Sequence, residues 1–175
     1  MSKFKAYLRS FRLRTLPLSV AGIVLGTMLA ASDGAFHAGR FALALLTVLL
    51  LQILSNVANE LGDTLRGTDS DERQGMVYSL QSGEISIAAM KRLIIWLVGL
   101  SALSGVALVA TSFEALLSRE GVVMLVLGAL AIVAALGYTL GRHPYGYMGL
   151  GDLFVFLFFW SALDHRRLLF DALAG

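Results

Sequence analysis

The chain has 175 residues, of which 57% are hydrophobic and 15% are charged, and its formal net charge is +2. This composition is too apolar for an average soluble domain and favours a membrane protein. The small positive charge requires no nucleic-acid partner, because the basic residues flank the apolar runs as membrane anchors do. Because the chain contains no cysteine, a disulfide framework and a thiolate metal site are both excluded.

Four uncharged apolar runs follow one another along the chain, at residues 15–32, 41–59, 93–113 and 121–141. Each approaches or reaches the roughly 20 residues that a helix needs to cross a bilayer. The basic N-terminus followed by an apolar run also resembles a signal peptide, but three longer runs follow, which favours a retained first helix. The sequence therefore predicts an all-α, polytopic membrane bundle with four full spans.

A fifth apolar run, at residues 153–163, is only about half the length of a span. If this run crossed the membrane, Arg166 and Arg167 would lie on the outer side, against the usual charge distribution. We therefore expect one membrane domain over residues 1–175, with a partial fifth span and an aberrant tail at residues 160–175.

The distribution of Lys and Arg predicts the orientation of the spans. With a cytoplasmic N-terminus, the inner side receives five basic residues before the first span, four in the 60–92 loop and Arg142 after the fourth span. The outer side receives only Arg40 and Arg119. This count predicts a multi-pass protein of the inner (plasma) membrane with its N-terminus in the cytoplasm.

Polar side chains continue from the second apolar run into an acidic loop, "NELGDTLRGTDSDERQG" (residues 59–75). Asn56, Asn59, Glu60 and Asp63 have the spacing of one helical face. Polar groups at the end of a span usually face protein or a cavity, and clustered oxygen ligands suit Mg²⁺ together with a phosphate. A helix end that simply meets water is the simpler alternative, although it does not require a stripe that begins inside the span.

Other recognisable sites do not fit the acidic loop. A calcium loop beginning at Asp69 has Arg73 and Gln74 at its fifth and sixth positions, where a ligand and glycine are needed, so it fails.

Basic residues on the predicted cytoplasmic side could clamp a diphosphate held by Mg²⁺. These are Arg66, Arg73, Lys91 and Arg92, and for the last two an ordinary membrane anchor is an equally good interpretation.

Three segments together resemble a known family: "RLRTLPLSVAGIVLGTMLA", "LLQILSNVANELGDTLRGTDSDERQG" with "SLQSGEIS", and "YTLGRHPYGYMGLGDLFVFLFF". They are similar to the UbiA superfamily of intramembrane prenyltransferases, and within it to the 1,4-dihydroxy-2-naphthoate prenyltransferases of menaquinone biosynthesis. The similarity extends from about Phe11 to Phe159. It implies an all-helical bundle in which two aspartate-rich motifs face each other across a cavity.

The resemblance implies roles for individual residues. Asn59 and Asp63 match the Mg²⁺-diphosphate element, and Glu60, where the family usually has Asp, is the third candidate metal ligand. Asp69 and Arg73 match the later acid and arginine of the motif. The third segment supplies candidate substrate-pocket residues, to which we add Asn56: Tyr138, Arg142, Tyr145, Tyr147 and Asp152.

The resemblance also implies a reaction and its partners. A polyprenyl diphosphate would ionise with help from Mg²⁺ and basic side chains, and the allylic cation would attack 1,4-dihydroxy-2-naphthoate within the lipid bilayer. The family's second acidic motif is not found after Asp152, so we expect this chain alone to be inactive. The alternatives are a membrane phosphoalcohol transferase, whose Asp-Gly-x-x-Ala-Arg signature is absent, and a small transport or channel subunit with a cation-binding face.

Overall fold

A computed structural model describes residues 3–67, 79–80, 83–140 and 146 of the chain. Within these residues the regular structure is entirely helical, which confirms the predicted all-α class. The elements in chain order are α1 (Lys3–Ser10), the 3₁₀ helix η1 (Leu13–Thr15), α2 (Leu16–Ser32), α3 (Ala38–Arg66), α4 (Ile87–Ser112) and α5 (Arg119–Gly137).

Four helical segments are long and apolar enough to cross a membrane, as the sequence predicts. They are Lys3–Ser32, Ala38–Arg66, Ile87–Ser112 and Arg119–Gly137. The second of them extends past the uncharged run and carries the first polar residues of the acidic loop on its last two turns. The short run at 153–163 and the tail at 160–175 lie outside the described residues.

Capping residues satisfy free backbone groups at the starts of α4 and α5 and at the end of α3. The Ser86 side chain accepts a hydrogen bond from the Ala89 amide at the start of α4, and Ser118 accepts one from the Gly121 amide at the start of α5. At the other end of α3, Gly67 adopts a left-handed conformation with φ of 65°, which lets its amide close the last turn. These caps fix three of the helix ends.

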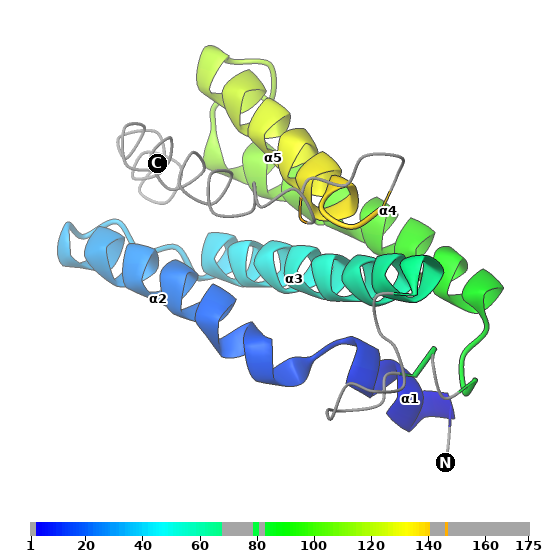
Figure 1. The fold of residues 1–175 in the computed structure, drawn as a ribbon. Coiled ribbons are helices and arrows are strands. Elements are labelled where there is room, and N and C mark those ends of the chain that lie inside the picture. Colours follow the sequence, from blue (N-terminus) through cyan, green and yellow to red (C-terminus); the bar gives the residue numbers. More distant parts are fainter. Residues whose placement is uncertain (1–2, 68–78, 81–82, 141–145, 147–175) are drawn as a thin grey trace.

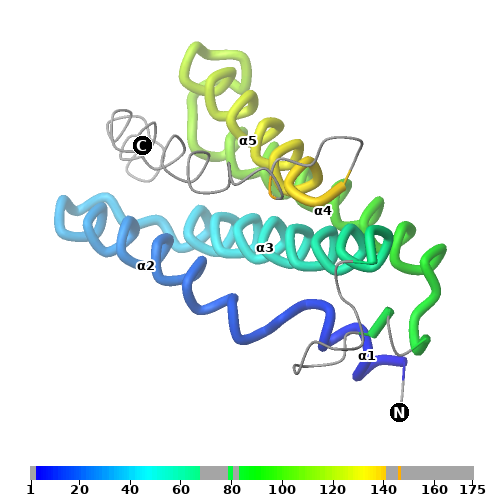
Figure 2. The backbone as a smooth tube through the Cα atoms, viewed as in Figure 1, coloured from blue at the N-terminus to red at the C-terminus, as the bar shows by residue number. Residues whose placement is uncertain are grey.

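The N-terminal segment is broken into two helices, a feature that the sequence did not predict. Arg12 adopts a left-handed backbone conformation with φ of 49° between α1 and η1, and α2 then starts with Pro17 in its first turn. As a result α1 turns away from the axis of α2, as the tube in Figure 2 shows. The first basic residues therefore belong to a short helix of their own.

Helix α3 is the central element of the bundle. It lies between α2 and α5 and packs most extensively against α4 (Figure 1). The end of α3, the start of α4 and the end of α5 lie at one end of the molecule, next to α1 (Figure 1). We call this the polar end, because the residues at 56–66 lie there.

The hydrophobic core is concentrated at the polar end. Its buried members come from α1, α3, the segment before α4 and the first turns of α4: Ala6, Leu54, Val57, Ala58, Leu61, Leu80, Ile85, Met90, Ile94 and Leu97. Further from the polar end the helices line a partly open apolar pocket of about 250 Å³, with glycines of α2, Thr47 and Met124 among its lining residues. The bundle is thus tightly packed where the polar residues lie and looser elsewhere.

Candidate functional site at the polar end of the bundle

Asn59 is held by the residues that end α5. The Thr139 hydroxyl lies 3.0 Å from Asn59 Oδ1 and 3.1 Å from the Ala58 carbonyl oxygen, and it donates its single proton towards these two acceptors. Thr139 is only 4% exposed, whereas Asn59 is half-buried. The amide oxygen of Asn59 therefore has a fixed position and keeps a second lone pair for another partner.

This contact requires a glycine on α3. A Cβ atom built on Gly62 would lie 2.6 Å from both the Cβ and the carbonyl oxygen of Thr139. No side chain can be accommodated there without moving the backbone at the end of α5. Gly62 thus brings the end of α5 close enough for Thr139 to reach Asn59.

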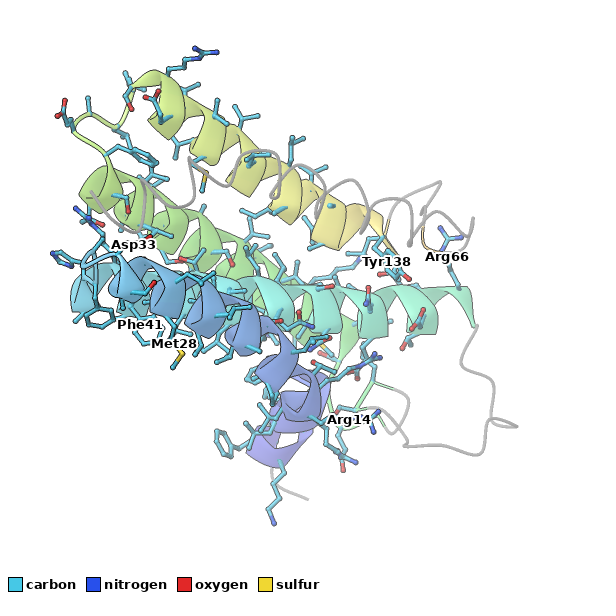
Figure 3. The ribbon with its side chains drawn as sticks, turned by 90° about the vertical axis from the view of Figure 1, so that its left-hand side faces the viewer. Arg14, Met28, Asp33, Phe41, Arg66 and Tyr138 are labelled. Atoms are coloured by element: carbon cyan, nitrogen blue, oxygen red, sulfur yellow. The ribbon has the colours of Figure 1, made fainter. Side chains whose placement is uncertain are left out.

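Asp63 and Arg66 continue the same part of α3 towards its end. Asp63 lies one turn after Asn59 and is half-buried. Arg66 is exposed in the last turn of α3. Figure 3 shows Arg66 and Tyr138 together at the polar end, while Asp33 and Phe41 lie at the opposite end. Asn59, Asp63, Arg66 and Tyr138 are therefore brought together.

Asn56 has different partners from Asn59. Its Nδ2 atom donates one hydrogen bond of 2.9 Å to the Phe11 carbonyl oxygen and one of 2.9 Å to Thr15 Oγ1. Asn56 is 5% exposed, and its amide satisfies the backbone where α1 and η1 meet. The polar stripe of α3 is therefore shared between the N-terminal segment and the end of α5 rather than facing one cavity.

Glu60 is fully buried, with 0% of its surface exposed. Its Oε1 atom accepts a 3.0 Å hydrogen bond from the Leu80 amide. Its Oε2 atom is buried and has no hydrogen-bond partner among the described residues. The structure therefore places the Glu60 carboxylate against the segment that precedes α4, while Asn59 and Asp63 stay partly open.

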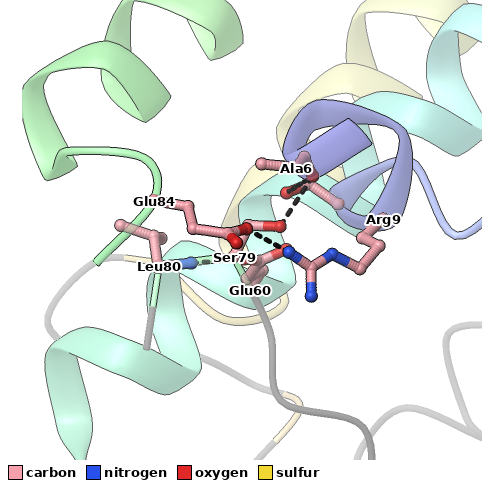
Figure 4. A network of polar contacts seen from close by, with 7 residues as sticks. Ala6, Arg9, Glu60, Ser79, Leu80 and Glu84 are labelled. Atoms are coloured by element: carbon pink, nitrogen blue, oxygen red, sulfur yellow. Dashed lines mark hydrogen bonds and ion pairs between the residues drawn. The ribbon is translucent and has the colours of Figure 1, made fainter. Parts of the chain in front are cut away.

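Two more contacts connect the segment before α4 to α1, and Figure 4 shows them beside Glu60. The Ser79 hydroxyl donates a 2.6 Å hydrogen bond to the Ala6 carbonyl oxygen. Arg9 of α1 forms an ion pair with Glu84. Ser79 and Ala6 are both 0% exposed, so this junction is part of the core.

Lys91 and Arg92 lie in the second turn of α4, exposed and at the polar end. The structure thus agrees with the expected side of the bundle for these two residues. Six other predicted site residues lie outside the described residues: Asp69, Arg73, Arg142, Tyr145, Tyr147 and Asp152.

Sequence reasoning missed the residues that position the site. Thr139 stands inside the third segment of the family resemblance, next to Tyr138, but its hydroxyl had no assigned role. Nothing in the sequence indicated that Gly62 faces Thr139, or that Arg9 pairs with Glu84, because these partners are far apart in the chain. Among the described residues, no three His, Cys, Asp or Glu side chains gather as a metal-ion cluster.

Comparison with known proteins gives several close matches. The chain is 47% identical over 159 residues to the 1,4-dihydroxy-2-naphthoate octaprenyltransferase of Escherichia coli K12, covering 91% of this chain and 51% of the relative. Proteins of the same name from Haemophilus influenzae and Mycobacterium tuberculosis are 43% and 37% identical over 159 residues each. These two comparisons cover 90% and 91% of the chain and 51% of each relative.

The chain spans about half the length of these curated relatives. No solved structure matches it. The UbiA prenyltransferase family matches residues 19–163, a range that includes most of the first apolar run, the other three, and the polar end of α3. On this match and these identities, the chain belongs to the UbiA prenyltransferase family.

Proposed function

We propose that this chain forms part of an enzyme that transfers a polyprenyl group from polyprenyl diphosphate to 1,4-dihydroxy-2-naphthoate, releasing diphosphate and the naphthoate carboxyl group as CO₂ and giving demethylmenaquinone in its reduced, dihydroxy form. The observation that carries the proposal is the 47% identity to the E. coli octaprenyltransferase across nine-tenths of the chain. The polar end supports it, since an amide and a carboxylate stand partly open where an apolar span ends. An allylic diphosphate has the same division into a charged head and an apolar tail.

The residues present at the polar end fit a magnesium ion. Asn59 and Asp63 offer neutral and charged oxygen atoms one helical turn apart, and Asp69 would add a third from the loop. Mg²⁺ in such sites takes few protein ligands and completes its coordination with phosphate oxygens and water. When bound, the ion would stabilise the negative charge that develops on the diphosphate. Because its carboxylate is buried, Glu60 is not included in this ligand set.

Other residues of the chain would orient the metal ligand and bind the two substrates. Thr139 orients the Asn59 oxygen, so that the ligand does not have to be ordered when substrate arrives. Arg66, Lys91 and Arg92 place positive charge around the proposed diphosphate site, and Arg73 would add to it from the loop. Tyr138 lies beside this group and would contribute, with Arg142, Tyr145, Tyr147 and Asp152, to the naphthoate pocket.

We also propose that the polar end faces the cytoplasm and that the protein resides in the inner (plasma) membrane. The start of the chain, the end of α3, the start of α4 and the end of α5 lie at the same end of the bundle (Figure 1). This arrangement groups the basic residues as the charge count requires. The diphosphate head of the donor and the naphthoate would then both reach the site from the cytoplasmic side.

The test uses a fusion of this chain to the part of the E. coli relative that the chain does not match. It is expressed in a host deleted for its own octaprenyltransferase, and the membranes are assayed for demethylmenaquinone with Mg²⁺, a polyprenyl diphosphate and 1,4-dihydroxy-2-naphthoate. We expect product from the fusion, and a loss of orders of magnitude with Asp63→Asn, which removes a ligand charge without changing volume.

Asp33→Asn is the matched control, because it removes the same charge at the opposite end of the bundle (Figure 3). This variant should retain activity. A fusion whose activity is equally insensitive to both substitutions would refute the assignment of Asp63. Mg²⁺ binding that does not depend on diphosphate would instead favour a transport or channel subunit.

A further inference from the structure

We propose that Glu60 is a positioning residue that holds the segment before α4 against α3 through the Leu80 amide, and that its carboxylate does not bind the metal ion. The hydrogen bond itself is independent of the proposed function, whereas the statement about the metal rests on it. The family resemblance implies a metal ligand at this place in the motif, so Glu60 receives a different role here.

Burial keeps Glu60 away from a bound substrate. A ligand shared with a diphosphate must be reached by substrate oxygens and water, and Glu60 is 0% exposed. Asn59, the preceding residue, is half-buried and accepts a hydrogen bond from Thr139, on a different side of the helix. One helical step of about 100° separates the two side chains. The chain therefore directs Asn59 and Glu60 to different surroundings.

Glu60 already has a partner in the segment before α4. A carboxylate oxygen accepting a backbone amide at 3.0 Å makes a normal, charge-assisted hydrogen bond. Leu80 is itself 8% exposed and belongs to the core cluster. Without Glu60, the Leu80 amide would be a buried donor that has lost this acceptor, which is costly.

This hydrogen bond attaches the chain to α3 a few residues after the acidic loop. Helix α3 ends at Arg66, and the chain returns at Leu80 to Glu60, somewhat less than two helical turns before that end. Ser79 and Glu84 contact α1 on either side of Leu80. The segment that carries Asp69 and Arg73 is thus attached to the bundle at both of its ends, which lowers the entropy cost of placing those side chains.

Changing the length or the charge of the Glu60 side chain distinguishes a positioning role from metal binding. Aspartate, the residue usual at this place in the motif, is shorter by one carbon–carbon bond of about 1.5 Å. Such a loss would take the 3.0 Å contact to Leu80 beyond hydrogen-bonding distance. Glutamine keeps the length and one carbonyl acceptor but loses the charge. A positioning role therefore needs the reach of Glu60, whereas a metal ligand needs its charge.

The first experiment measures hydrogen exchange of the Leu80 amide by NMR, using this chain in detergent micelles. We expect protection in the parent chain, protection within about threefold of it in Glu60→Gln, and a loss of about tenfold or more in Glu60→Asp. Asp63→Asn is the matched control and should leave the Leu80 amide protected. An unprotected amide in the parent, or equal protection in the Gln and Asp variants, would overturn the inference.

The second experiment measures the Mg²⁺ concentration for half-maximal prenyl transfer in the fusion described above. We expect Glu60→Gln to leave this concentration within about twofold, while Asp63→Asn raises it about tenfold or more. A tenfold rise in Glu60→Gln, or full activity in Glu60→Asp, would overturn the inference. If the unsubstituted fusion were inactive, the proposed function would fail while the exchange experiment still decided the role of Glu60.

Discussion

Replacing Gly62 by alanine tests how closely α3 and the end of α5 must approach. The new Cβ atom would lie 2.6 Å from the Thr139 Cβ and carbonyl oxygen and 2.9 Å from its carbonyl carbon. Ordinary van der Waals contacts between carbon atoms begin at about 3.5 Å, so the end of α5 must move by about 1 Å. Two of the three obstructing atoms belong to the backbone, and a rotamer change cannot relieve them.

The expected change in the free energy of unfolding caused by Gly62→Ala combines two destabilising contributions with one stabilising contribution. Overpacking in a close-packed region costs about 1–3 kcal/mol. The displaced Thr139 hydroxyl also loses its contacts to Ala58 and Asn59, worth about 1 kcal/mol. Alanine returns up to about 1 kcal/mol through its higher helix propensity. We therefore expect Gly62→Ala to destabilise the bundle by about 2 kcal/mol.

The measurement is unfolding of the chain in mixed micelles by titration with sodium dodecyl sulfate, followed by circular dichroism. Gly99→Ala in α4 is the matched control, because no heavy atom lies within 4 Å of the position that its new methyl group would take. That variant should be as stable as the parent or more stable by up to about 1 kcal/mol. Thr139→Ala should not rescue Gly62→Ala, because the backbone atoms remain. Equal stability of the two glycine variants would refute the close approach.

Three further outcomes are expected. Thr139→Val in the fusion should lower prenyl transfer by about tenfold while Thr139→Ser stays close to the parent, because only the hydroxyl orients Asn59; equal rates would contradict that role. Ser70→Cys, in a chain without cysteine, should react with a membrane-impermeant maleimide in inverted vesicles but not in intact cells, and labelling of intact cells would reverse the proposed orientation. Asn56→Leu should lower the unfolding midpoint, because it removes the donor that serves the Phe11 carbonyl and the Thr15 hydroxyl, and an unaltered midpoint would argue against this junction.

The four spans were predictable because the physical signal is local. A run of apolar residues about as long as the bilayer is thick forms a helix whatever surrounds it. The ends were predicted less well, and α3 continues to Arg66, beyond its uncharged run, because a polar helix end is equally compatible with water. The break at Arg12 escaped prediction since a left-handed arginine has no sequence signature.

The sequence predicts which residues form the candidate site, but not how their side chains are arranged. The spacing of Asn56, Asn59, Glu60 and Asp63 placed them on one side of a helix, and the structure agrees that they lie on α3 at one end of the bundle. Asn56 bonds to Phe11 and Thr15, whereas Asn59 bonds to Thr139 and Glu60 to Leu80. These partners come from three other parts of the chain. Helical periodicity describes one helix alone, so it could not divide this set among different neighbours.

The uneven packing of the bundle has a consequence for how the sequence can vary. Of the apolar window of α5, 6% is buried within the described part of the chain, against 28% in α3 and in α4. Leu54, Val57 and Met90, at the polar end, are each 0% exposed. Exchanges among apolar side chains should therefore be tolerated along most of α5 and rejected around these three residues. A library of single substitutions would show a gradient of tolerance along the membrane normal, lowest beside Asn59.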